Sequence, residues 1–137
     1  MKKNKGFSLM ELTIVLAILA IIAAILIPTF FNLTDGARLR SDVQSARTIQ
    51  NAMELYRLNS GRQVAGGNDI AQILTNLTTA EYLSARGTDI QTAGANWVVD
   101  EGRVFVDITG LDGGVQRAYN ALSDADRAMV RGGVRTP

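Results

Sequence analysis

Residues 7–31 read FSLMELTIVLAILAIIAAILIPTFF, and this stretch decides the architecture of the chain. Between residues 12 and 27, every position except Thr13 is apolar. As an α-helix the stretch would span roughly 37 Å, which exceeds the hydrocarbon thickness of a bilayer. The sequence therefore predicts a helix that crosses a membrane.

The basic residues around this stretch are distributed unevenly. All three lysines, Lys2, Lys3 and Lys5, precede it, and the next basic residue is Arg38. Basic flanks stay in the cytoplasm, so we expect a cytoplasmic N-terminus and an exported remainder. Without residues 1–6, the formal charge of this 137-residue chain changes from +1 to −2. A secretory signal fits poorly, because the apolar run is long and no small-x-small cleavage site closes it.

Glu11 interrupts the apolar stretch near its start. A lone acid inside a membrane costs roughly 2.5–3.5 kcal/mol on insertion scales. Two interpretations are open. Ser8 and Glu11 have the spacing of a capping box, in which Glu11 would bond a free backbone N–H near the interface. Alternatively, Glu11 pairs with a positive charge from another chain, such as an amino terminus created at Phe7 by cleavage after Gly6.

Gly6 followed by FSLME and an apolar run containing Pro28 resembles the N-terminus of type IV pilins and pseudopilins. The likeness covers about residues 2–31 and, more loosely, the segment up to Asn59. It implies that residues 1–6 are a leader cut after Gly6 and that Phe7 becomes the N-methylated first residue. It also implies that Glu11 pairs with the Phe7 amine of an adjacent subunit and sets the axial register. Pro28 would kink or locally melt the helix, since proline removes one backbone hydrogen bond.

The same resemblance implies a structural subunit that polymerises through its N-terminal helix into a type IV pilus for adhesion, motility or surface contact. The alternative is a pseudopilin of a type II secretion or competence DNA-uptake machine. Implied partners are further copies of the chain in a helical filament, other or minor pilins, the prepilin peptidase/methyltransferase, the inner-membrane assembly platform, and membrane lipid before assembly. The subunit would begin as a single-pass membrane protein and end in an extracellular filament.

Residues 32–59 predict a continuation of the helix that is amphipathic. Apolar residues recur at spacings of three and four, which places them on one face. They are Leu39, Val43, Ala46, Ile49 (or Gln50), Met53 and Tyr56. We expect this face to pack on the chain's own head, residues 60–137.

The sequence of the head predicts short helices and short strands. A helix follows Asn68-Asp69, with another helical turn at residues 78–83, and a hairpin joins residues 96–100 to residues 103–108. The tail predicts two helices, the second running through Val130. We expect Trp97 and Phe105 in the core. The fold class is therefore α+β: a long helix packed on a small antiparallel sheet with short helices.

The composition excludes several kinds of chemistry. The chain has no His and no Cys, which excludes disulfides, thiolate or imidazole metal sites, and Cys/His or Ser/His catalysis. The balanced charge argues against a specific nucleic-acid binder. Two carboxylate pairs, Asp100/Glu101 and Asp124/Asp126, are interpreted as turn and cap residues rather than as a hydrolase site. Four aspartates, Asp107, Asp112, Asp124 and Asp126, could gather around a calcium ion, but their spacing matches no calcium loop. We expect no enzyme, cofactor or metal, and a signal-anchored enzyme or binding domain is the remote alternative.

Overall fold

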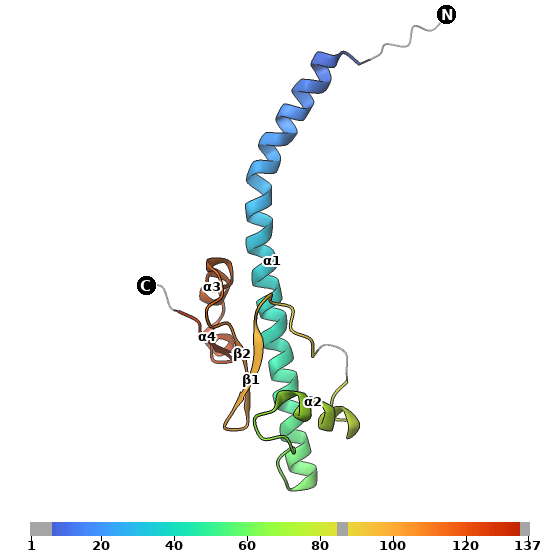
Figure 1. The fold of residues 1–137 in the computed structure, drawn as a ribbon, viewed down its shortest axis with the longest axis vertical. Helices are drawn as coiled ribbons and strands as arrows, with labels where there is room; N and C mark the ends of the chain where they lie inside the picture. The colour runs from blue at the N-terminus through green and yellow to red at the C-terminus, as the bar shows by residue number, and fades with distance from the viewer. Residues whose placement is uncertain (1–6, 85–87, 135–137) are drawn as a thin grey trace, which may run out of the picture.

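Helix α1 (Leu9–Ser60) runs through most of the molecule in the computed structural model, which describes residues 7–84 and 88–134 apart from the Asn32 side chain. Its 52 residues span roughly 78 Å at 1.5 Å per residue. Figure 1 shows that its N-terminal half projects alone, while the other half carries the head. The helix ends at Gly61, whose φ of 68° is left-handed and whose N–H bonds to the Arg57 carbonyl.

Helix α1 continues through Pro28 without a break. Proline has no N–H to donate to the carbonyl four residues earlier. In the next turns, the Thr29 and Thr34 hydroxyls donate to the Ile25 and Phe30 carbonyls at 3.1 and 2.9 Å. Such side-chain bonds bend helices, and Figure 1 shows a gentle curve in the projecting half.

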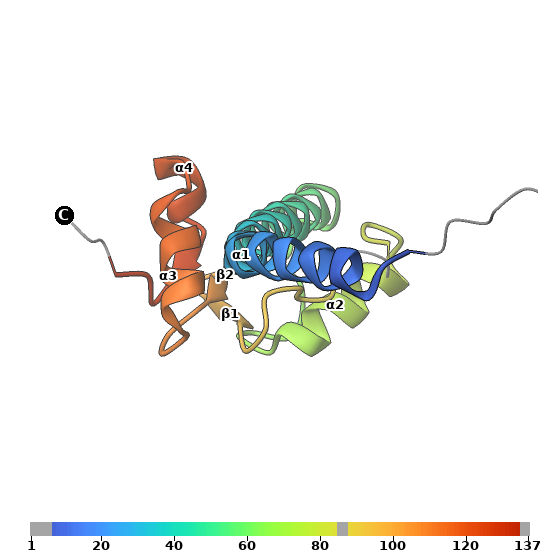
Figure 2. The same cartoon turned by 90° about the horizontal axis from the view of Figure 1, so that it is seen from above.

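The described part of the head, residues 60–84 and 88–134, contains three short helices and three strands. In chain order they are α2 (Ile70–Thr79), β1 (Asn96–Asp100), β2 (Arg103–Asp107), α3 (Gly113–Asn120), α4 (Asp124–Arg127) and β3 (Val130–Arg131). Seen along the helix in Figure 2, α3 and α4 lie on one side of α1 and α2 lies on the other. The long helix and the mixed elements confirm the predicted α+β class.

The sheet has the order β1-β2-β3 and is mixed rather than antiparallel. The predicted hairpin is confirmed, with Asn96 opposite Asp107 and Asp100 opposite Arg103. The third strand was predicted as helix, and that prediction is wrong. The backbone N–H of Val106 bonds to the Met129 carbonyl at 2.9 Å, and Val130 then pairs in parallel with β2. Pairing with a strand far away in the sequence outweighs local helix propensity here.

The predicted helical turn at residues 78–83 is also absent. Helix α2 ends at Thr79, and Glu81 has a positive φ of 60°, which no right-handed helix contains. The N–H groups of Tyr82 and Leu83 turn back to the Leu77 carbonyl instead. The segment is therefore the C-terminal end of α2 rather than a new helix.

The core lies between α1 and the head, as the apolar stripe predicts. Leu39, Val43, Ala46 and Ile49 are at most 2% exposed. They meet buried residues of the sheet and of the short helices: Ile73, Leu77, Val99, Val104, Val106, Val115 and Tyr119. The amphipathic half of α1 is thus the central element of the head.

The two large aromatics of the sheet differ in position. Trp97 packs half-buried against the core, and its Nε1 donates to the Thr88 carbonyl at 2.9 Å. Phe105 lies on the opposite, outer face, so the prediction that it joins the core is wrong. Side chains alternate along a strand, and Val104 already faces α1. The Arg103 and Arg131 guanidinium carbons lie 5.3 and 4.7 Å from the Phe105 ring centroid.

Candidate functional site

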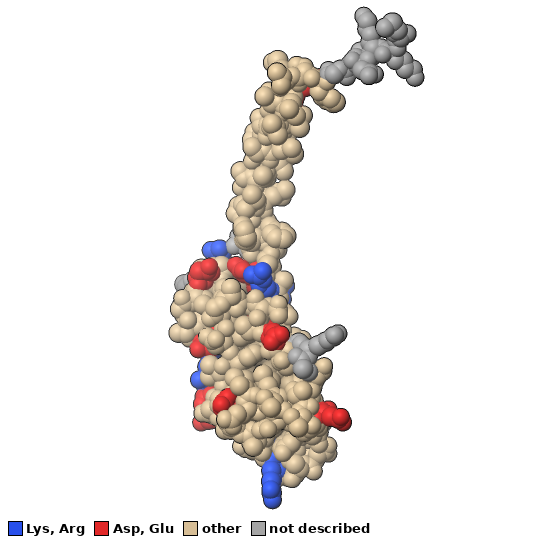
Figure 3. Space-filling model, turned by 45° about the vertical axis from the view of Figure 1, so that its right-hand side comes forward, with Lys and Arg blue, Asp and Glu red and all other residues tan. Residues whose placement is uncertain are grey.

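The projecting half of α1 is the largest uncovered apolar surface of the described residues. Its large hydrophobic side chains are exposed by between 46% at Ile22 and 83% at Leu9. The helix is long and apolar enough to cross a membrane. Figure 3 shows this surface projecting from a head on which the charged side chains gather. Patches of this size on soluble monomers mark interaction sites, so this helix needs lipid or other helices around it.

The first turn of α1 contains the capping box that the spacing predicts. The Ser8 hydroxyl accepts the Met10 N–H at 3.2 Å, and Glu11 Oε2 accepts the Ser8 N–H at 3.0 Å. The cap interpretation of Glu11 is therefore confirmed within one chain. Phe7 is exposed just before the cap, whereas Gly6 lies outside the described residues. Pairing of Glu11 with a second chain stays a prediction.

Two polar side chains on the core face of α1 hold distant backbone segments. Asp42 is fully buried, and its two oxygens accept the N–H groups of Gln91 and Thr92 at 2.7 and 2.8 Å. Gln50 donates to the Gly102 carbonyl at 3.3 Å and accepts the Val104 N–H at 3.0 Å. These contacts fix the loop before β1 and the hairpin turn onto α1.

Neither the Asp42 contacts nor the Gln50 contacts are predicted by the sequence pattern, although the sequence contains one signal for Asp42. Asp42 lies three residues after Leu39 and four before Ala46, so it interrupts the apolar stripe with an acid. An acid at such a position is buried, and a buried carboxylate needs hydrogen-bond donors. Which donors it finds depends on the tertiary structure alone.

Ion pairs join further elements of the head. Arg47 on α1 contacts Asp126 on α4 at 2.7 Å, and Arg131 on β3 pairs with Asp100 on β1. An arginine of the amphipathic half therefore stabilises its own subunit. In exposed positions such pairs contribute at most about 1 kcal/mol each.

The aspartates weighed as calcium ligands each have another contact. Asp112 accepts the Gly114 and Val115 N–H groups at the start of α3, and Asp124 pairs with Arg127 at 3.0 Å. Asp107 accepts the hydroxyl and N–H of Thr109, which lower the pKa of its carboxyl, with a smaller contribution from Arg131. Within residues 7–84 and 88–134, no three carboxylates converge on one point.

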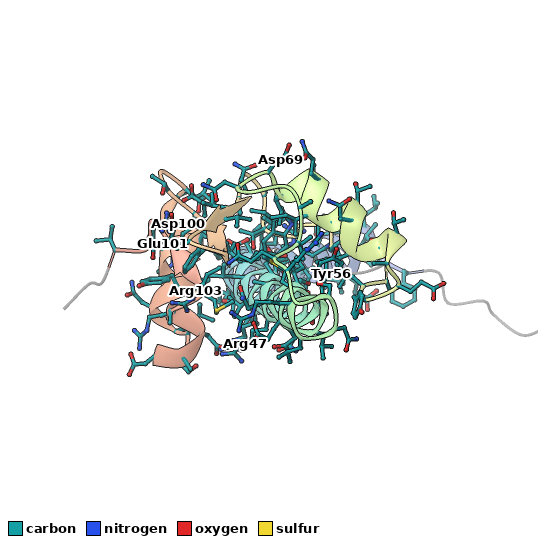
Figure 4. All side chains as sticks on the ribbon, turned by 90° about the horizontal axis from the view of Figure 1, so that it is seen from below. Arg47, Tyr56, Asp69, Asp100, Glu101 and Arg103 are labelled. Carbon is teal, nitrogen blue, oxygen red and sulfur yellow. The ribbon has the colours of Figure 1, made fainter. Side chains whose placement is uncertain are left out.

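At the far end of the head, a cavity of about 450 Å³ is lined by α1, the loop after α1 and the hairpin turn. Figure 4 views the head from this end, with Glu101 on the hairpin turn to one side of α1. The walls of this cavity come from three separate segments of the chain, so the sequence pattern does not predict it.

Comparison with known proteins finds a family match at the N-terminus and longer matches to individual proteins. Residues 1–27 match the family described as "Prokaryotic N-terminal methylation motif". The chain is 36% identical over 88 residues to "Prepilin peptidase-dependent protein D" of Escherichia coli, covering 62% of this chain and 58% of that protein. It is 34% identical over 82 residues to a "Fimbrial protein" of Moraxella nonliquefaciens, covering 60% and 53%.

A third relative belongs to a different machine. The chain is 26% identical over 81 residues to "Type II secretion system core protein G" of Vibrio cholerae, covering 59% of this chain and 56% of that protein. The matches thus span roughly half the length of these curated relatives. No solved structure matches the chain.

Proposed function

We propose that this chain, which belongs to the family of type IV pilins and pseudopilins, is a subunit that polymerises through α1 into a type IV pilus filament. The observation that carries the proposal is the exposed apolar half of α1 beside a head with its own buried core. Lipid covers this half before assembly, and the same half of neighbouring copies covers it afterwards. Burial against other helices replaces lipid contacts, so the subunit leaves the membrane without exposing apolar surface to water.

Processing prepares the N-terminus for this step. In the proposal, a prepilin peptidase removes residues 1–6 by cutting after Gly6, and the new amine at Phe7 is methylated. Cleavage discards all three lysines and places a positive charge one helical turn before Glu11. The subunit is then a single-pass membrane protein with an exported head until it enters an extracellular filament.

Glu11 has two successive roles in this proposal. In the single subunit its carboxylate bonds the Ser8 N–H, which keeps the acid at the helix end. In the filament it pairs with the Phe7 amine of an adjacent copy and fixes the axial register. A pair in water contributes little, but an acid left without its partner in an apolar bundle costs roughly 3–5 kcal/mol.

The experiment compares Glu11→Gln with Glu11→Ala. Glutamine also completes a capping box, so Glu11→Gln keeps the cap and removes only the charge. We expect both variants to insert into the membrane and both to yield at least tenfold fewer filaments. Thr13→Ala, which removes a neighbouring hydroxyl that donates to the Met10 carbonyl, serves as the control. Normal filament yield from Glu11→Gln would refute charge pairing and leave the cap as the role of this residue.

The likeness to a type II secretion core protein supports a second candidate, a pseudopilin that forms a short fibre for secretion or DNA uptake. The fimbrial and prepilin peptidase-dependent relatives are more similar in sequence and favour the pilus subunit. Shearing native cells distinguishes the two, because a pilus subunit dominates the sheared fraction and a pseudopilin does not. Mass spectrometry of the native N-terminus tests the family role itself: intact residues 1–6 would favour a signal-anchored binding domain or enzyme.

Assembly needs partners beyond the chain itself. We propose the prepilin peptidase/methyltransferase and an inner-membrane assembly platform, with other or minor pilins in the filament. Two of the relatives carry the description "prepilin peptidase-dependent", which supports the first of these partners. Deleting the peptidase in the native host is expected to leave the precursor in the membrane with residues 1–6 attached.

A further inference from the structure

The cavity at the far end of the head has the chemistry of a site for a long cationic side chain. Its lining includes the apolar side chains of Met53 and the buried Val64. The polar lining residues include Gln63, Asn68 and Glu101. Glu54 and Arg57 also line the cavity, but they pair with each other at 2.7 Å, which leaves Glu101 as the unpaired charge. An arginine fits such a site, because its methylene stem packs on apolar surface while the guanidinium bonds a carboxylate.

Glu101 is held in place by an unusual turn. Glu101 and Gly102 have φ values of 50° and 75°, the pattern of a two-residue hairpin turn that favours Asn-Gly. The Gln50 side chain fixes this turn through its bonds to Gly102 and Val104. Glu101 itself makes no ion pair or hydrogen bond among the described residues. A rigid turn therefore presents an unpaired carboxylate at the cavity.

Most described arginines have a partner in their own chain. Arg47, Arg57, Arg127 and Arg131 form ion pairs, Arg103 lies over the Phe105 ring, and Arg117 also has a contact. Arg38, Arg40 and Arg62 remain without one among residues 7–84 and 88–134.

Position decides between these three arginines. Arg62 adjoins the cavity-lining Gln63 in the loop after α1, at the same end of the head. Arg38 and Arg40 are exposed on α1 at the opposite end, where the helix enters the head. Figure 3 shows charged side chains around this entry point. Because Arg38 and Arg40 lie at the opposite end of the head from the cavity, their guanidinium groups can enter only the cavity of another copy of the chain.

We propose that the cavity binds an arginine, Arg38 or Arg40, from the base of the head of a second copy of this chain. This inference rests on the proposed function and names a contact between heads within the filament. The contact joins two different surfaces of the head, the one that carries Arg38 and Arg40 and the cavity beside Glu101. It can therefore repeat from copy to copy without closing into a dimer. An interface of this type generates an open helical filament.

The spacing of the two patches agrees with side-by-side packing of the apolar helices. Arg40 precedes the cavity residues Gln50 and Arg57 by 10 and 17 positions, which corresponds to roughly 15–25 Å along α1. Two copies displaced by this amount still overlap along their projecting halves, which are roughly 34 Å long. Head contact and helix contact are therefore possible in one arrangement.

Cysteine cross-linking tests the contact directly, because the chain has no cysteine of its own. Glu101→Cys is combined with Arg38→Cys in one chain and with Arg40→Cys in another, and assembled filaments are oxidised. We expect a ladder of cross-linked multimers from at least one combination. Glu101→Cys with Asp89→Cys, an exposed acid elsewhere on the head, is the control and should give no ladder.

Charge exchange supplies the second readout. Glu101→Arg should lower filament yield at least tenfold, as should Arg38→Glu combined with Arg40→Glu, and joining all three changes should restore it. If wild-type chains assemble but neither cysteine combination gives a ladder, the inference is overturned. This holds even if Glu101→Arg lowers the filament yield, because the cavity would then bind a group other than Arg38 or Arg40. If wild-type chains form no filaments at all, the proposed function fails instead.

Discussion

Replacing Asp42 by asparagine tests what holds the head on the long helix. The side chain keeps its shape, but one of its two acceptor oxygens becomes an NH₂ group. Either the Gln91 or the Thr92 N–H, now bonded at 2.7 and 2.8 Å, then faces a donor. The remaining bond loses its charge.

The magnitude follows from these two bonds. A hydrogen bond to a charged group contributes roughly 1.5–3 kcal/mol, and a buried N–H left unpaired costs roughly 1–3 kcal/mol. Since Asp42 is 0% exposed, water cannot replace the lost acceptor. We expect Asp42→Asn to lower the free energy of unfolding by about 2–4 kcal/mol. For a domain of this size, that lowers Tm by about 10–25 °C.

The assay uses the full chain in detergent micelles and the fluorescence of Trp97, the chain's only tryptophan. This residue reports on the same loop, because its indole N–H bonds to the Thr88 carbonyl. Asp89→Asn is the matched control, since it removes an equal charge from an exposed position in that loop. If the two variants melt within 2 °C of each other, the Asp42 clamp does not stabilise the head.

Four further substitutions test the C-terminal half of the head. Gly132→Ala should lower the free energy of unfolding by about 2–3 kcal/mol, because its φ of 76° is left-handed and a Cβ there would clash with the Thr109 backbone. Gly102→Ala, with a φ of 75° but open space around it, should cost only about 1 kcal/mol; equal losses in chemical denaturation would contradict the steric argument. Thr109→Ala should raise the pKa of Asp107 toward its ordinary value, as measured by NMR titration, because the hydroxyl bond that lowers this pKa is lost. A depressed pKa means that the stabilisation by Asp107 is present above pH ~4 and is lost as the pH falls further, so wild type and Asp107→Asn should converge in stability at low pH. An unchanged Asp107 pKa in Thr109→Ala would contradict the assigned cause.

Some features of the candidate site follow from the sequence, and others do not. The capping box of Ser8 and Glu11 follows from a spacing of three residues and is confirmed. Pairing of Glu11 with a second chain stays a prediction, since it requires another copy. The cavity beside Glu101 had no counterpart in the sequence pattern, because its walls come from α1, the loop after it and the hairpin turn.

The sequence by itself determined the long helix, its apolar and amphipathic halves, the hairpin and the helix caps. These features depend on neighbours within a few residues, and periodicity and turn chemistry report such neighbours directly. Only the tertiary structure decided that Val130 joins a sheet, that Phe105 faces outward, and that Asp42 and Gln50 hold segments about fifty residues away. The physical reason is that buried polar groups and strand edges must find hydrogen-bond partners, and the partners available depend on which distant backbone groups folding brings to them.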